Sequence, residues 1–304
     1  MVEYKSGAIG LKKGWKTIVK EGNQFRYVLA PKSDAVKLAE KIASKPPNET
    51  CLACHAFSGG GPHFKRSNLS PDLIRNVNEE FDVHMVRGLF CSDCHVFEDH
   101  KFGLNSSDTW ARDSNKTVSC EDCHEKRHRV PIVGSVLNTF HQKVACQTCH
   151  IPIIAREKYP TDVRRDWSHI EFNEKLGRWE PEITLKSNVI PVYLWWNGES
   201  REAYVYPERA KVVDGKIILS KPIGSKDDED SKIYPYKLHT AIVPFDEGRG
   251  VPVPIKVGMV FALGDYNKAI NADASVSGLK FDGKYVTLVR YMAVTTEFCP
   301  RKRL

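Results

Sequence analysis

The pattern of hydrophobic and polar residues divides the chain into two parts. After about residue 167, short runs rich in aromatic and β-branched residues alternate with turn dipeptides, which predicts β-strands joined by tight turns. The predicted strands cover residues 189–196, 201–206, 211–213, 216–219 and 285–294. Because Asn-Gly at 197–198 and Asp-Gly at 214–215 are typical hairpin turns, the first four strands should form two hairpins. This part is therefore predicted to be an antiparallel β-rich lobe.

The part before residue 166 has much weaker periodicity. Residues 1–32 mix glycines, lysines and isolated aromatics, as an extended arm does, and residues 34–44 carry apolar side chains on one side, which predicts a short helix. From there to about residue 160, many short polar connections predict short helices and loops. We therefore expect a mixed fold. The predicted domains are 1–45 (N-terminal arm and short helix), 46–165 (segment of short helices and loops) and 166–304 (β-rich domain).

One five-residue unit, Cys-x-x-Cys-His, occurs four times in this first part. The copies begin at Cys51, Cys91, Cys120 and Cys146. C-x-x-C-H is the attachment signature of c-type haem, in which two thiols add to the porphyrin vinyl groups and the adjacent histidine ligates the iron. A zinc site or a redox dithiol would leave the histidine that follows every cysteine pair unexplained. We therefore predict four covalently bound haem c groups, whose apolar faces supply much of the core of this segment.

The four motifs assign most of the cysteines and four of the histidines. The predicted haem-attachment residues are Cys51, Cys54, Cys91, Cys94, Cys120, Cys123, Cys146 and Cys149. The predicted proximal iron ligands are His55, His95, His124 and His150. The ninth cysteine, Cys299, is interpreted as a small buried residue, with a pairing or reactive thiol as the alternative.

The ligand on the other face of each iron decides function, because a second strong ligand suits electron transfer and an open position permits substrate chemistry. The candidate distal ligands are His84, His100, His128, His141, His239 and His63. His100 and His128 follow a proximal histidine by five and four residues, so they start on the wrong face of their own haem and should serve neighbouring haems. For each candidate, and for His169, the alternative is an ordinary exposed or core histidine.

Charge and hydropathy restrict the partners and the location. The formal net charge is +7, and the propionates of four haems would remove roughly four units, so the lysines are not interpreted as a nucleic-acid surface. No apolar run has the length of a membrane span. Because c-type haem is attached outside the cytoplasm, we expect an extracellular or cell-surface protein whose targeting segment is absent from this numbering. Sequons at Asn48, Asn68, Asn105 and Asn115 suggest a glycosylated surface.

Several segments resemble the octahaem tetrathionate reductase family. The run VACQTCHIP at 144–152 is the longest, and the others are 59–61, 65–66, 82–85, 159–161, 166–168, 196–198, 221–224 and 236–239. The resemblance implies that this chain is a truncated relative with four haems, whereas members of the family carry eight. Family catalysis uses one haem with a lysine-type distal ligand, for which Lys65, or His63 beside it, is the candidate at the first haem.

A looser resemblance is to the subunits of extracellular cytochrome filaments, which implies association with identical subunits and a distal histidine shared across a boundary. We therefore expect a multihaem cytochrome that carries electrons outside the cytoplasm through four closely packed, mostly bis-histidine haems, to redox partner proteins or within a conductive homopolymer. The alternative is a haem-dependent reductase of small sulfur or nitrogen oxyanions of the tetrathionate, nitrite or hydroxylamine type. A third interpretation makes the β-rich half a docking module for a partner reductase.

Overall fold

The structure is a computed structural model that contains two compact units, Met1–Pro46 and Pro47–Leu304. It describes residues 2–5, 8–11, 16–21, 24–29, 46–67, 69–79, 81–98, 101–102, 118–124, 128, 132–156, 159–198, 200–202, 204, 208–294 and 297. The predictions that lie outside these residues are the helix at 34–44, His100, Cys299 and the sequons at Asn68, Asn105 and Asn115.

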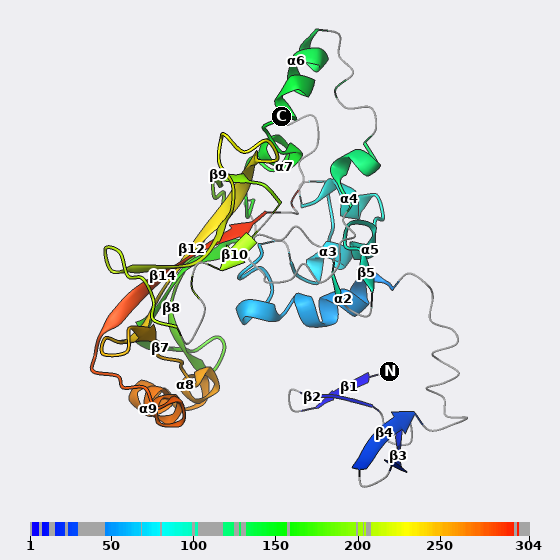
Figure 1. The fold of residues 1–304 in the computed structure, drawn as a ribbon. Coiled ribbons are helices and arrows are strands. Elements are labelled where there is room, and N and C mark those ends of the chain that lie inside the picture. The colour runs from blue at the N-terminus through cyan, green and yellow to red at the C-terminus, as the bar shows by residue number, and fades with distance from the viewer. Residues whose placement is uncertain are drawn as a thin grey trace. The chain divides into compact units, whose positions relative to one another are not determined.

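The first unit consists of two antiparallel hairpins where the sequence predicted an extended arm (Figure 1). Strand β1 (Val2–Lys5) pairs with β2 (Ala8–Leu11), and β3 (Lys16–Glu21) pairs with β4 (Gln24–Leu29). Each strand is short, and each hairpin is a two-stranded sheet.

The second unit begins with the segment that carries the four Cys-x-x-Cys-His motifs, and its described helices are all short, as predicted. They are α2 (Asn48–His55), η1 (Ser58–Gly60), α3 (Asp72–Arg75), α4 (Val83–Val86), α5 (Cys91–Cys94), η2 (Cys120–Asp122), α6 (Val133–Phe140) and α7 (Cys146–His150). Two strands of two residues each, β5 (Phe97–Glu98) and β6 (Lys101–Phe102), pair with each other after α5. A small apolar cluster of Leu52, Ala56, Leu73 and Phe81 packs α2 against α3.

An eight-stranded sheet forms the rest of this unit, in the order β10-β11-β14-β12-β7-β8, with β9 and β13 also paired to β12. The strands are β7 (Thr161–Asn173), β8 (Arg178–Lys186), β9 (Val192–Trp196), β10 (Ser200–Glu202), β11 (Lys216–Pro222), β12 (Lys232–Asp246), β13 (Val251–Pro252) and β14 (Tyr285–Ala293). Most pairs are antiparallel, whereas β11–β14 and β12–β7 are parallel. The predicted mixed fold, with short helices followed by a β-rich lobe, is confirmed.

Helices α8 (Val257–Leu263) and α9 (Tyr266–Ser277) pack at one end of the sheet (Figure 1), where Val260 and Ala269 bury Trp167 of β7. No helix in the described part of the chain is long and apolar enough to cross a membrane.

Of the two predicted hairpins, the turn at Asp214-Gly215 is present, and the prediction of a hairpin at Asn197-Gly198 is wrong. At Asp214-Gly215 both residues have positive φ, 49° and 69°, and the backbones of Val213 and Lys216 exchange two hydrogen bonds of 2.9 Å, as a tight hairpin turn requires. At Asn197-Gly198, however, β9 pairs with β12 and β10 pairs with β11. The long central strand β12 buries Tyr234 and Tyr236, so pairing with it removes more apolar surface from water than a local hairpin would.

The fourth motif is docked directly on the sheet. The backbone of Ala145, which precedes α7, donates to the carbonyl of Ile233 at 3.0 Å, and Ile233 donates back to Lys143 at 2.8 Å. The Thr148 hydroxyl donates to the same Ile233 carbonyl at 2.7 Å. Ala145 and Tyr234 share one apolar cluster. The sheet therefore fixes the position of the motif that ends the Cys-x-x-Cys-His series.

Candidate haem-binding site

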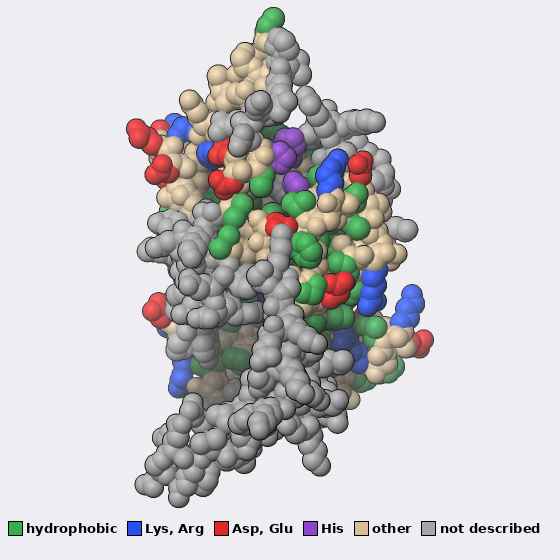
Figure 2. Space-filling model, turned by 90° about the vertical axis from the view of Figure 1, so that its right-hand side faces the viewer, with side chains coloured by type: hydrophobic (Ala, Val, Ile, Leu, Met, Phe, Trp, Pro, Cys, Tyr) green, Lys and Arg blue, Asp and Glu red, His purple; other side chains and the backbone are tan. Residues whose placement is uncertain are grey.

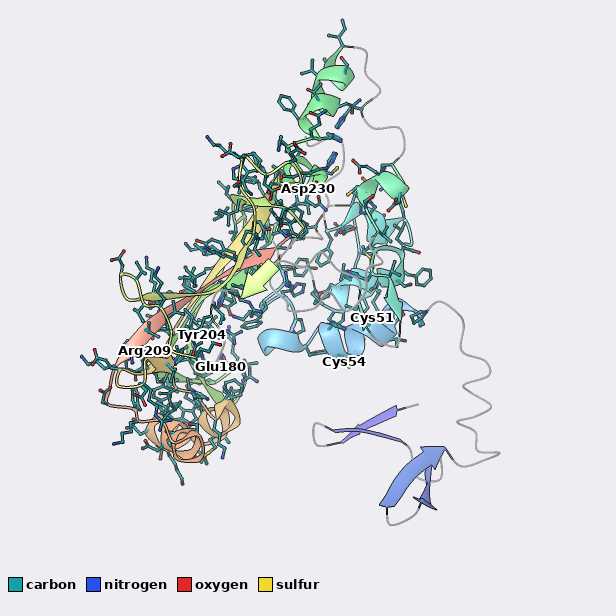
Figure 3. All side chains as sticks on the ribbon, viewed as in Figure 1. Cys51, Cys54, Glu180, Tyr204, Arg209 and Asp230 are labelled. Atoms are coloured by element: carbon teal, nitrogen blue, oxygen red, sulfur yellow. The ribbon has the colours of Figure 1, made fainter. Side chains whose placement is uncertain are left out.

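All four motifs present their two thiols in the same way. The first cysteine of each motif is partly buried and the second is exposed: Cys51, Cys91, Cys120 and Cys146 belong to the first group, and Cys54, Cys94, Cys123 and Cys149 to the second. In the first motif both cysteines lie on one short helix, α2, as Figure 3 shows for Cys51 and Cys54. Each motif therefore offers one inward and one outward attachment point.

Inward thiols of successive motifs lie against one another. The thiols of Cys51 and Cys91 hydrogen-bond to each other, and burial together with this neighbour raises the pKa of Cys91 to about 12. The thiols of Cys120 and Cys146 do the same, and this bond and burial raise the pKa of Cys120 far above its ordinary value. Motif spacing alone did not predict these two pairs.

The outward thiol of the second motif lies among acidic groups. Burial raises the pKa of Cys94, and the charges of Asp93, Asp82 and Cys123 raise it further. Inward thiols are therefore neighbours between the first and second motifs and between the third and fourth.

Asn48 joins the first two motifs. Its Nδ2 donates to the carbonyl of Leu89 at 3.2 Å, and its Oδ1 accepts from the backbone N–H of Cys91 at 2.7 Å. The side chain thus links the start of α2 to the start of α5 across more than forty residues. The sequence singled out Asn48 only as a possible glycosylation site.

Two pairs of histidines face each other at similar separations. The ring centroids of His84 and His124 are 6.0 Å apart and tilted by 59°. Those of His128 and His150 are 6.3 Å apart and within 6° of parallel. A ligand–metal bond from imidazole is about 2 Å long, and the ring centre lies about 1 Å further, so two imidazoles on opposite sides of one metal are about 6 Å apart. These residues therefore fit a haem iron between each pair.

The protonation states of three histidines, His84, His95 and His150, suit metal binding. Burial lowers the pKa of His84, His95 and His150 below the ordinary value. For His150, the neighbouring imidazoles of His128 and His124 lower it further. The neutral imidazole is the form that ligates a metal.

Asp82 holds His84 in place. It is the N-cap of α4, and its Oδ1 accepts from the backbone N–H of His84 at 2.8 Å and of Met85 at 3.1 Å. Its Oδ2 accepts from the backbone of Glu297 at 3.0 Å. The position of this candidate ligand is therefore set by a buried cap from its own segment, which is in turn anchored near the C-terminus.

His63 is engaged in a different environment. Its Nδ1 lies 2.5 Å from the Ser67 carbonyl and its Nε2 3.1 Å from Asp72 Oδ2, and its ring stacks on Tyr159 at 4.3 Å. Both nitrogens thus have partners, so this arrangement does not present His63 to an iron. Its role as a distal ligand stays a prediction.

His239 and Lys65 meet around Asp162, a carboxylate that the sequence did not single out. Lys65 Nζ lies 2.6 Å from His239 Nε2 and 3.3 Å from Asp162 Oδ2, and His239 Nε2 lies 3.2 Å from Asp162 Oδ1. Arg165 Nε donates to Asp162 Oδ2 at 2.5 Å. Burial lowers the pKa of Lys65 to about 8 and that of His239 to about 4, whereas His239 and Lys65 hold the pKa of Asp162 below its usual range despite its burial.

The remaining candidates lie elsewhere. The ring of His141 is edge-on to that of His128, 5.2 Å away, at the end of α6. His169 is largely exposed on β7 and lies within ligand distance of Asp166 and Glu182. Because the Arg164 guanidinium already binds both carboxylates, at 2.5 and 3.3 Å, this trio is a satisfied ion-pair network.

Figure 2 shows histidine side chains reaching the surface next to hydrophobic ones.

Repeated haem-attachment motifs with a common thiol arrangement, together with imidazole pairs separated by the span of an iron, define a multihaem c-type cytochrome.

Comparison with known proteins agrees with this class. Residues 155–302 match the family described as bacterial cytochrome c, and residues 77–151 match cytochrome c7 and related cytochrome c. An uncharacterized protein of Archaeoglobus fulgidus is 49% identical over 112 residues, which are 36% of this chain and 37% of that protein. The chain thus matches little more than a third of this relative's length.

The fold is shared with a solved structure, the octahaem cytochrome c from Shewanella oneidensis. The TM-score is 0.66 at 24% sequence identity, over 94% of this chain and 67% of that chain. The specific resemblance to tetrathionate reductases, in contrast, stays a prediction.

Proposed function

We propose that this protein transfers electrons through four covalently attached haem c groups that follow one another in sequence order. The observation that carries the proposal is the series of four Cys-x-x-Cys-His motifs, in which the inward thiols of Cys51 and Cys91, and those of Cys120 and Cys146, are neighbours. Each thiol marks one edge of a bound porphyrin. Because electronic coupling falls steeply with the distance between cofactor edges, adjacent attachment edges favour transfer between consecutive haems.

Bound haem supplies the one-electron chemistry, and the chain supplies position and environment. The inward cysteines would attach neighbouring porphyrins, and Asn48 fixes the spacing of the first two motifs. Burial of His95 and His150 keeps the proximal imidazoles neutral and limits water around them, which tunes the potentials.

The test is a haem count and a spectrum of the holoprotein. Mass spectrometry should find four haems attached to the chain, and electron paramagnetic resonance should find only low-spin iron that is reversibly reduced and reoxidised. Fewer than four haems, or iron that does not cycle, would contradict the proposal.

The same proposal includes a location outside the cytoplasm and association with identical subunits. Support comes from the covalent mode of haem attachment and from the number of histidines beyond the four proximal ones. Electron microscopy of the purified protein tests the assembly: ordered filaments would support a conductive homopolymer, and single particles under all conditions would exclude it. Redox partner proteins would then receive electrons from the terminal haems.

A second candidate function is reduction of a small sulfur or nitrogen oxyanion. The observation that favours it is the group of Lys65, Arg165 and His239 around Asp162, which combines two cations and a neutral imidazole in a partly buried place. Such a group attracts anions and can supply protons. A high-spin iron that binds nitrite or cyanide would support this function, and four low-spin irons that ignore both would exclude it.

A further inference from the structure

We infer that His84 is the sixth ligand of the iron whose proximal ligand is His124, and that His128 is the sixth ligand of the iron whose proximal ligand is His150. The inference rests on the proposed function, because it requires haem at the third and fourth motifs. It names the second protein ligand of two irons, for which the motifs supply only the proximal histidine.

The pair His128–His150 carries the argument most directly. Two imidazoles that bind one iron from opposite sides keep their nitrogens on a common axis, with ring centres about 6 Å apart. The observed separation is 6.3 Å with ring planes 6° apart. Direct stacking contact between two rings would bring parallel planes closer together, as it does for His63 and Tyr159 at 4.3 Å. The separation of the ring centres of His128 and His150 matches the width that an iron between them would need.

The pair His84–His124 repeats the spacing with a different tilt. Its ring centres are 6.0 Å apart and its planes differ by 59°. Rotation about an iron–nitrogen bond leaves the bond length unchanged, so two axial imidazoles can adopt any angle between their planes. Burial of Asp82, which caps the helix of His84, fixes the backbone from which this ring extends.

The competing histidines fit these irons less well. His141 stands perpendicular to His128, at 86° and 5.2 Å, so it packs on the side of that ring rather than opposite His150. His239 lies beside Lys65 and Asp162. His63 has both nitrogens engaged. Of the described distal candidates, His84 and His128 alone face a proximal imidazole across the width of a metal.

Both assigned ligands come from a segment that serves another haem. His84 lies seven residues before Cys91 of the second motif, and His128 lies four residues after His124 of the third. Each iron bond would therefore tie one motif's segment to the next haem. The neighbouring thiols of Cys120 and Cys146 agree with this for the third and fourth motifs. The second, third and fourth haems would be cross-linked through their metals.

The test replaces each histidine with methionine in the holoprotein. Methionine remains an iron ligand but raises the reduction potential. In His84→Met and in His128→Met we expect one of the four low-spin signals to be replaced and one of the four reduction steps to move to higher potential. The matched control His169→Met, at an exposed histidine on β7, should leave all four signals in place.

An unchanged spectrum in a folded His84→Met or His128→Met variant would overturn that assignment. If a variant does not fold, a map of the wild-type holoprotein that resolves the irons decides the question. His84 and His124 nitrogens must then bind one iron, and any other sixth ligand there would overturn the inference. Fewer than four haems in the wild type would instead count against the proposed function.

Discussion

Lys65 Nζ lies 2.6 Å from Nε2 of His239, although the two residues are 174 positions apart in the chain. This contact joins the loop after the first motif to the central strand β12. Gly59 makes room for it, because a Cβ at this position, where φ is +74°, would collide with the Lys65 side chain. The glycine that follows the motif therefore has a steric reason to be there.

Asp162→Asn should destabilise the protein strongly. The Asp162 side chain is fully buried and pairs with Lys65 at 3.3 Å and with Arg165 at 2.5 Å. Removing its charge leaves buried cations without a counter-charge, for which we expect a loss of about 3–5 kcal/mol in the free energy of unfolding. Denaturant unfolding of the holoprotein measures the loss.

The control for this prediction is Glu182→Gln. Glu182 is half exposed and pairs with Arg164 at 3.3 Å, so its loss should cost no more than about 1 kcal/mol. Equal effects of the two substitutions would contradict the role given to Asp162.

Glu297 should make stability fall as the pH rises from about 4.5 to about 8. Burial raises its pKa from 4.5 to about 8, while the Ala155 N–H bond and Arg156 oppose the shift. Between these values the unfolded chain has lost the proton and the folded chain keeps it, so folding takes up a proton and higher pH favours unfolding. The change is on the order of a few kcal/mol for a shift of this size.

Glu297→Gln should flatten this part of the profile of unfolding free energy against pH. Glu247→Gln, at an exposed carboxylate 3.9 Å from Lys284, should leave the profile unchanged. A slope that survives in Glu297→Gln would show that another group is responsible.

Asn48→Ala should loosen the contact between the first two motifs. It removes the hydrogen bonds to Leu89 and Cys91, with an expected cost of about 1–3 kcal/mol because the Cys91 N–H loses its acceptor. Reductive titration should also show a changed interaction between two of the haems. Asn76→Ala is the control, since the exposed Asn76 side chain donates to Asp72, four residues away, at 2.7 Å. We further expect the peptide that contains Asn48 to carry no glycan, because Nδ2 lies between two helices.

Gly264→Ala should cost more than Gly177→Ala. Both glycines have φ values near +65°, namely +67° and +61°, so both substitutions introduce similar backbone strain of about 1 kcal/mol. Only at Gly264 does the new methyl group collide with the indole ring of Trp179. An additional loss of about 1–3 kcal/mol is expected there. Thermal unfolding of the two variants side by side isolates the effect of the collision.

Local chemistry in the sequence predicted the local features of the structure. The turn at Asp214-Gly215 and the strand at 285–294 depend on neighbouring residues, and both are present. The hairpin at Asn197-Gly198 failed because β12 and β11 compete for the same strands, and such competition is invisible in a short window.

The partners of the candidate site residues depend on long-range contacts. The sequence placed His84 and His128 among the possible ligands, but only the fold brings them opposite His124 and His150. It gave no signal for Asp162, because a single Asp in a strand has no distinguishing spacing. A charge buried beside His239 becomes evident only when β7 and β12 lie side by side in the sheet.

The contact between inward thiols has a consequence for biogenesis. Thiols held against one another, as in Cys51–Cys91 and Cys120–Cys146, are well placed to form a disulfide in an oxidising compartment. Each such bond would consume one attachment thiol from two different motifs and so block two haems at once. We therefore expect haem attachment to this chain to require that these cysteines remain reduced until haem arrives.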